Sequence, residues 1–338
     1  MHLYRVATTA AFLSLAAAGA AQNYHIVDHW KIGGAGGWDY LLSDDAADRL
    51  YLTHNSKVEV LDTSTGKLVG AVTGLKSTHG VALNPDGKTG YISDGAGNSI
   101  IVFNRADLSV TTMVPAGTNP DGITFEPTTK TVWAFNGRSK NVSVMDTGTN
   151  TIVDTITLPG KPEFPQVDED GSVFVNIEDK NEIIKLDGKS RRAVATWPLE
   201  GCDSPSGMAI DRAGHRLFSV CDGGKMAIVN YETGKLLGLA SIGSSPDASG
   251  FDPKHGLAFS SNGGDGTLTI VDATKPGFPT LQTLKTAKGA RTMALDVATG
   301  RVYLVTAQFG PAPAPTDAIP HPRPTVLPDS FEVIVVER

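Results

Sequence analysis

The sequence contains seven copies of one pattern. Each copy has a short apolar strand, a turn rich in Asp, Pro and Gly, and a second strand, as in STHGVALNPDGKTGYISD and SPDASGFDPKHGLAFSSNG. A third and a fourth strand follow, as in KVEVLDTSTG and KLVGAVTG. Strands joined by such turns predict hairpins. Each copy therefore predicts a unit of four antiparallel strands.

The spacing of the copies identifies the architecture. The third residue of each copy serves as its marker, and successive markers lie 40, 42, 42, 43, 41 and 44 residues apart. The markers are Asp39, His79, Asp121, Glu163, Ser206, Asp247 and Arg291. Four strands in about 40 to 45 residues is the size of a β-propeller blade. The chain is therefore predicted to be all-β, a seven-bladed β-propeller with blades starting near residues 37, 77, 119, 161, 204, 245 and 289.

The two ends of the chain are expected to close the ring. The last copy has strands at MALDV, RVYLVTA and FEVIVVE and lacks a fourth, whereas NYHIVDHWKIGG near the start resembles the fourth strand TIVDTITLPG. A ring of sheets leaves two open edges unless its ends pair, so residues 24–32 are predicted to complete blade seven. GGAGGW would then join this strand to blade one. It is not a dinucleotide loop, because Asp39 stands where G-x-G-x-x-G needs its third glycine.

The first residues predict export. Arg5, an apolar stretch through Leu15, and small residues at Ala18 and Ala20 are typical of a secretory signal peptide over residues 1–21. A retained anchoring helix is the alternative. Cleavage would leave one propeller of residues 22–338, periplasmic or secreted, with no membrane span and expected to be a monomer.

The charge of the chain disfavours nucleic acid as a partner. Without residues 1–21 the chain has 28 basic and 36 acidic side chains, a net charge of −8. Its Arg and Lys clusters fall at different places in the repeat and form no stripe. Nucleic-acid binding requires a positive surface.

The repeats resemble the YVTN-type β-propeller repeat, on signatures such as VEVLDTSTGKLVG and VSVMDTGTNTIVDTITLPGKP. Over residues 24–338 the chain resembles the YncE-like family of bacterial propellers. This resemblance implies the propeller fold but no single function, because such propellers serve as binding modules, enzymes and scaffolds alike. Some members of the family are linked to DNA binding, which the net charge disfavours here. Two copies depart from the pattern, since KPEFPQV places proline in an inner strand and the last copy carries a proline-rich insertion, residues 308–330.

The markers are the candidate binding residues. The innermost strand of each blade lines the central channel, so the starts of these strands should converge on one mouth. The candidates are Asp39, His79, Asp121, Glu163, Asp247 and Arg291. Clustered carboxylates repel one another unless a cation offsets them, so a divalent cation held by some of the acids and His79 is a candidate cofactor. Alternatively, each Asp only turns the chain, and Arg291 only pairs with a neighbouring acid.

Other groups are expected at the same mouth. Loops between second and third strands carry oxygen ligands, such as Asp94, Asn176 and Asn262, which would suit Ca²⁺. Cys202 and Cys221 are predicted to form a disulfide, as is usual in an exported protein, with free thiols or a redox pair as alternatives. The 308–330 insertion lies on this face as a lid, a docking segment or a passive loop.

These features favour a binding or scaffold module that recognises a small ligand or a protein partner at the carboxylate-lined mouth. The alternative is a metal-dependent enzyme of the lactonase or lyase type, with a cation at the mouth. DNA binding ranks third. No residue is assigned a catalytic role, because the chain has no G-x-S-x-G motif and no C-x-x-C motif.

Overall fold

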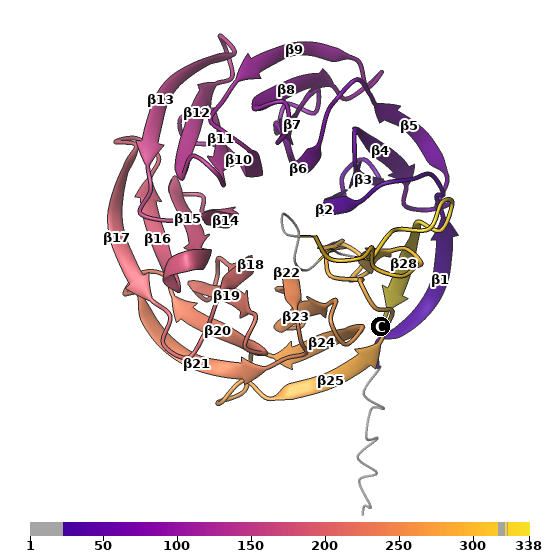
Figure 1. Ribbon diagram of the computed structural model, residues 1–338. Helices are drawn as coiled ribbons and strands as arrows, with labels where there is room; N and C mark the ends of the chain where they lie inside the picture. Colours follow the sequence, from indigo (N-terminus) through magenta and orange to yellow (C-terminus); the bar gives the residue numbers. More distant parts are fainter. Residues whose placement is uncertain (1–22, 317–321, 323) are drawn as a thin grey trace, which may run out of the picture.

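The computed structural model describes residues 23–316, 322 and 324–338. Strands β1 to β28 form seven four-stranded antiparallel sheets, which stand as blades around a central axis (Figure 1). The all-β, seven-bladed propeller expected from the repeats is thereby confirmed. The signal peptide expected at residues 1–21 lies outside the described residues.

The first six blades follow the chain in order, each from its innermost to its outermost strand. The inner strands are β2 (Trp38–Asp44), β6 (Thr78–Leu83), β10 (Pro120–Glu126), β14 (Pro162–Val167), β18 (Pro205–Asp211) and β22 (Pro246–Asp252). The second strands are β3 (Arg49–His54), β7 (Thr89–Asp94), β11 (Thr131–Asn136), β15 (Ser172–Ile177), β19 (Arg216–Cys221) and β23 (Leu257–Asn262). The third strands are β4 (Lys57–Asp62), β8 (Ser99–Asn104), β12 (Asn141–Asp146), β16 (Glu182–Asp187), β20 (Lys225–Asn230) and β24 (Thr267–Asp272). The outer strands are β5 (Leu68–Val72), β9 (Val110–Pro115), β13 (Thr151–Thr157), β17 (Arg192–Pro198), β21 (Lys235–Ser241) and β25 (Thr280–Lys285).

Blade seven is built from both ends of the chain. Its order is β26 (Met293–Leu295), β27 (Val302–Thr306), β28 (Glu332–Glu337) and β1 (His25–Lys31). Strand β1 pairs antiparallel with β28, from His25 opposite Glu337 to Lys31 opposite Glu332. This confirms that an N-terminal strand completes the last blade.

The glycine stretch after β1 makes the joint between blades seven and one. Gly33, Gly34 and Gly36 have φ angles of 73°, 87° and 106°, in the left-handed region that side chains with a Cβ rarely adopt. Gly34 N donates to Asp329 Oδ1 at 3.0 Å, and Asp329 N donates to Gly34 O at 2.8 Å. The joint is therefore fastened to the end of the 308–330 insertion.

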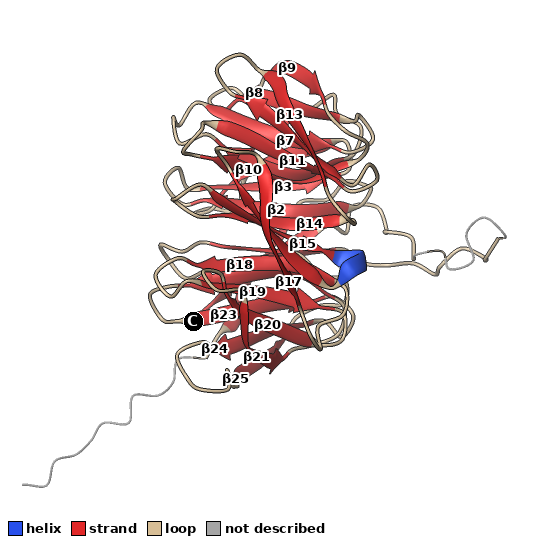
Figure 2. Cartoon of the chain, turned by 90° about the vertical axis from the view of Figure 1, so that its left-hand side faces the viewer, coloured by secondary structure: helices blue, strands red, loops and turns tan. Residues whose placement is uncertain are grey.

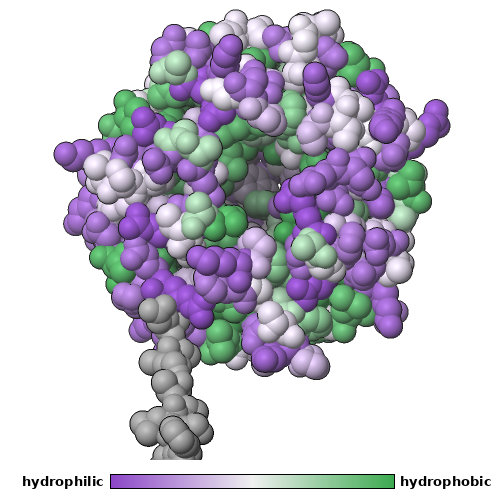
Figure 3. All heavy atoms as spheres, turned by 180° about the vertical axis from the view of Figure 1, so that it is seen from behind, coloured by the Kyte–Doolittle hydropathy of each residue, from purple (hydrophilic) through white to green (hydrophobic). Residues whose placement is uncertain are grey.

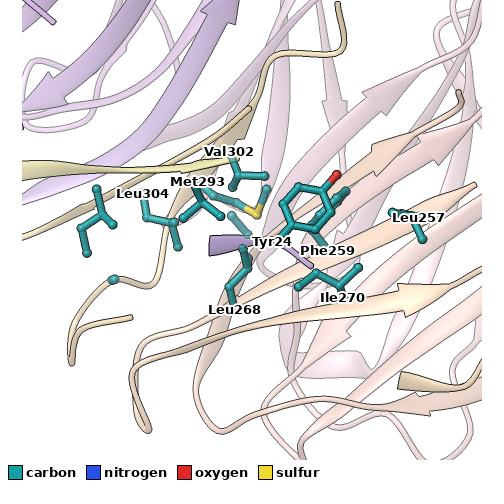
Figure 4. Packing of buried hydrophobic residues seen from close by; sticks show 12 residues of the cluster. Tyr24, Leu257, Phe259, Leu268, Ile270, Met293, Val302 and Leu304 are labelled. Atoms are coloured by element: carbon teal, nitrogen blue, oxygen red, sulfur yellow. The ribbon is translucent and has the colours of Figure 1, made fainter. Parts of the chain in front are cut away.

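Neighbouring blades pack through their buried faces. The second strands β11 and β15 are buried at every residue, because each blade is covered on both sides by its neighbours. One cluster joins blades six and seven, and Figure 4 shows Tyr24 against Phe259, with ring centroids 5.2 Å apart. Tyr24 lies just before β1 and is 3% exposed, so closure also buries an aromatic side chain.

The two cysteines form the expected disulfide. Cys202 precedes β18, Cys221 ends β19, and their Cα atoms are 5.4 Å apart. Both residues are fully buried. The bond closes the loop that leads into the inner strand of blade five.

The only helical element in the described residues is the 3₁₀ turn η1 (Glu178–Lys180). Within that part of the chain, no helix is long and apolar enough to cross a membrane. The described parts of the 308–330 insertion project beyond the face on which η1 lies (Figure 2). At its base, Phe309 bridges to Val326, and the Trp38 ring lies 6.0 Å from Phe309 and 5.4 Å from Phe331.

The closure predicts a large loss of stability for Tyr24→Ala. Removing a fully packed aromatic side chain should lower the free energy of unfolding by about 3–5 kcal/mol, measured by urea unfolding. Tyr24→Phe is the matched control, because the Tyr24 hydroxyl is buried without a hydrogen-bond partner among the described residues. Equal stability of Tyr24→Ala and Tyr24→Phe would contradict a closure that depends on this contact.

The disulfide predicts a dependence of stability on redox state. Its cysteines are 19 residues apart, and closing a loop of that size stabilises a protein by about 3 kcal/mol. Reduction should lower the free energy of unfolding by this order, measured in urea with and without a reductant. The Cys202→Ser/Cys221→Ser variant should not respond to reductant.

Candidate functional site at the mouth of the channel

The fold brings the markers to one end of the channel. Six of them occupy the same place, the second residue of an inner strand, and Arg291 lies two residues before β26. Inner strands start at the end where their second strands finish, since Trp38 pairs with His54 and Pro120 with Asn136. The markers and the loops between second and third strands therefore share one face.

One chain of contacts links blades five, six, seven and one. Ser206 Oγ donates to Asp247 Oδ1 at 2.7 Å, and Arg291 Nη1 pairs with Asp247 Oδ2. The same Nη1 lies 3.6 Å from Asp39 Oδ1, and Arg291 Nη2 donates to Trp38 O at 2.9 Å. Arg291 thus pairs with neighbouring acids, as the alternative from the sequence proposed.

His79 continues the chain to blade three. Its Nδ1 lies 2.6 Å from Asp39 Oδ2 and 3.7 Å from Asp121 Oδ1. One suitable ligand atom from each of these three side chains lies within 4.8 Å of the others. Among the described residues, these three are therefore the set that could hold a metal ion.

Glu163 is held by different partners. Its Oε1 lies 2.6 Å from Lys161 Nζ, which also pairs with Glu178 at 2.5 Å. Its Oε2 accepts a hydrogen bond from the Tyr40 hydroxyl at 3.4 Å. Glu163 therefore belongs to a second set of contacts, formed with Lys161, Glu178 and Tyr40, beside the set that runs from Ser206 to Asp121.

Burial raises the pKa of Asp121 to about 8, with further contributions from the charges of Asp39 and Glu163. Burial alone would lower the pKa of His79, but its hydrogen bond to Asp39 and the charges of Asp121, Asp39 and Glu163 outweigh it and raise that pKa to about 9. Burial also raises the pKa of Glu163, although Lys161 acts in the opposite direction. The acids at the mouth therefore exceed the positive charge available to them.

Two aromatic rings meet in the channel just beneath these residues. The Tyr40 and Phe164 rings, from blades one and four, meet edge to face with centroids 4.7 Å apart. Beyond them lies a cavity of about 680 Å³, whose walls include Leu42, Leu83 and Phe125. Figure 3 shows this hollow at the centre of the opposite face. The two rings form an aromatic floor beneath the mouth, and both also line the cavity.

The sequence contained a signal for this floor that the marker residues alone did not show. The residue after the marker is Gly, Ala or Thr in five copies, but Tyr40 and Phe164 in the other two. Aromatic side chains at equivalent inner positions of two blades can meet across a channel. Lys161, two residues before Glu163, was also missed.

Loop residues expected to offer oxygen ligands are bonded to the blades around them. Asp94 accepts hydrogen bonds from the backbone of Lys76 and Ser77, the latter at 2.7 Å. Asn262 is buried and donates to Thr267 and Thr269, and Asn176 is equally buried. The side-chain oxygens of Asn262 and Asn176 accept hydrogen bonds from Ser260 Oγ and Ser219 Oγ, each at 2.8 Å, so these loop residues bond within and between the blades around the mouth.

Comparisons with known proteins identify the fold alone. No protein-family model matches the chain, and no curated protein sequence matches it. A chain of Kuenenia stuttgartiensis hydrazine synthase is similar in structure, with a TM-score of 0.69 and 17% identity, covering 80% of this chain and 92% of that one. The structure of U3-55K is similar with a TM-score of 0.74 and 9% identity, covering 93% and 98%. At these identities the likeness shows a β-propeller and no particular activity.

The raised pKa values predict that alkaline pH destabilises the protein in a buffer with chelator. Asp121 has a folded pKa of about 8 against 3.8 ordinarily, so stability falls as pH rises through that window. Stability from protonated His79 is fully present below pH 6.5 and is lost as pH rises through about 9. Both effects have the same sign.

Asp121→Asn tests the wider of these two pH ranges, the one that belongs to Asp121. It should reduce the fall in the free energy of unfolding between pH 5 and pH 8, measured by urea unfolding across this range. Exposed Glu200→Gln is the control and should keep the wild-type dependence. A wild-type slope in Asp121→Asn would show that Asp121 does not carry the effect.

Proposed function

We propose that this propeller is a binding module that takes a positively charged ligand at its mouth. One observation carries the proposal: acids outnumber bases in the two neighbouring sets of contacts at the mouth, which together are called the mouth network. The acids are Asp39, Asp121, Glu163, Glu178 and Asp247, and the bases are His79, Lys161 and Arg291. A cation would offset the surplus and lower the repulsion among the carboxylates.

Access to the mouth supports a ligand of modest size. The side chains of His79, Asp39 and Asp247 are 21%, 18% and 20% exposed. These side chains are reachable from solvent, yet they are buried enough for electrostatic interactions to be stronger than in bulk water. The Tyr40–Phe164 floor would lie beneath such a ligand.

Two further parts of the proposal concern location and family. Export to the periplasm or beyond is supported by the leader-like residues 1–21 and by the Cys202–Cys221 disulfide. Membership of the YncE-like branch of propellers is supported by the YVTN-like signatures repeated along the chain.

A panel of cations tests the proposal. Divalent metal ions, a polyamine and a short Lys-rich peptide are each added to the purified protein, and the shift in melting temperature is measured. At least one should stabilise the protein, and Asp39→Asn should weaken that ligand's binding by about tenfold or more, since it removes one unit of charge.

Glu200→Gln is the matched control, because it removes an exposed acid outside the network and should bind as wild type. The proposal fails if no cation in the panel binds, or if binding survives in Asp39→Asn as it does in Glu200→Gln.

A further inference from the structure

We propose that the ligand at the mouth includes one divalent transition-metal ion, bound by Asp39, His79 and Asp121. The inference rests on the proposed function, because it names which cation the mouth takes. The three side chains come from the inner strands β2, β6 and β10 of consecutive blades. Rigid strands thus present them to one point, as a preorganised site requires.

The spacing of the three groups is close to that of a metal site. Metal bonds of about 2.0–2.2 Å place neighbouring ligand atoms roughly 3.3 Å apart in a tetrahedral site. His79 Nδ1 lies 3.7 Å from Asp121 Oδ1 and 2.6 Å from Asp39 Oδ2. Side-chain movements of under about 1 Å would bring these atoms to the spacing of a metal site. The short His79–Asp39 contact is a hydrogen bond, and the ion would take the place of its hydrogen.

Asp121 is weakly partnered for a carboxylate in this position. Its side chain is 13% exposed and lies 3.7 Å from His79 Nδ1, but its carboxylate accepts no hydrogen bond from any residue that the structure describes. A buried carboxylate normally has such donors, because burying an unpaired charge is costly. Glu126 is the ordinary case, fully buried and accepting bonds from the Thr128 and Thr129 amides at 2.6 and 2.9 Å.

Neighbouring residues hold His79 in the required orientation. A Cβ added at Gly95 would lie 2.5 Å from His79 Nε2, so only glycine lets the backbone pass this edge of the ring. The opposite ring nitrogen, Nδ1, then faces Asp39 and Asp121. Ser93 Oγ accepts from Gly80 N at 2.8 Å and also bonds the Asp121 carbonyl, which ties the two ligand strands together.

The donor set selects the class of ion. One imidazole nitrogen and two carboxylates suit Zn²⁺, Mn²⁺ or a similar transition-metal ion, whereas Ca²⁺ and Mg²⁺ prefer oxygen ligands alone. Three protein ligands leave at least one coordination position for water or a second ligand. His79 is partly exposed, so that position would face solvent.

Metal stoichiometry and affinity test the inference. The purified protein is stripped with a chelator, dialysed against Zn²⁺ or Mn²⁺, and measured by elemental analysis and isothermal titration calorimetry. We expect about one ion per chain, a rise in melting temperature with that ion, and a much smaller rise with Ca²⁺. His79→Gln and Asp121→Asn should each weaken binding by about 100-fold or more.

The control is His255→Gln. It breaks another His–Asp pair of the same length, His255 Nδ1 to Asp252 Oδ2 at 2.6 Å, which lies outside the mouth. This variant should keep wild-type affinity. Asp121→Asn also guards against misfolding as an explanation, because its carboxylate accepts no hydrogen bond from the described residues and its circular dichroism should match wild type.

The outcomes separate this inference from the proposed function. If a polyamine or basic peptide binds at the mouth and no transition-metal ion does, the metal site is wrong and the cation-binding function stands. If no cation binds, both fall. Binding of metal that is equally tight in Asp121→Asn and in wild type also overturns the site.

Discussion

The pairing of β1 with β28 is the interaction on which the rest of this protein depends. Each blade is only four strands wide and has little core of its own, so it is stable when both faces are covered by neighbours. Without β1, the outer edge of β28 would have no partner strand, and an open ring would leave two blade faces bare. Closure removes these costs and keeps the seven inner strands around one axis (Figure 1).

A fixed axis has a chemical consequence. Residues at the same position of successive repeats lie about 40 residues apart in sequence, yet some of their side chains meet, as His79 and Asp39 do at 2.6 Å and Ser206 and Asp247 do at 2.7 Å. Carboxylates from blades one, three, four and six therefore share a small volume. Burial, together with the charges of Asp39 and Glu163, raises the pKa of Asp121.

Much of this arrangement followed from the repeat. Equal spacing predicted the number of blades, the missing fourth strand predicted the closure, and the marker position predicted which side chains converge. The sequence did not show which side chains pair. Asp39 lies between Arg291 and His79, while Glu163 pairs with Lys161, and these choices depend on side-chain reach and orientation around the ring.

The sequence by itself determined the ring and the residues at its mouth, because strand pattern and repeat length are local properties that add up along the chain. Only the tertiary structure decided that the Tyr40 and Phe164 rings meet in the channel and that the Asp121 carboxylate accepts no hydrogen bond from the described residues. Both are contacts, or missing contacts, between blades. They depend on the distances between side chains of different blades across the central axis. Residues that meet in this way are far apart in the sequence, so no local pattern predicts the contact.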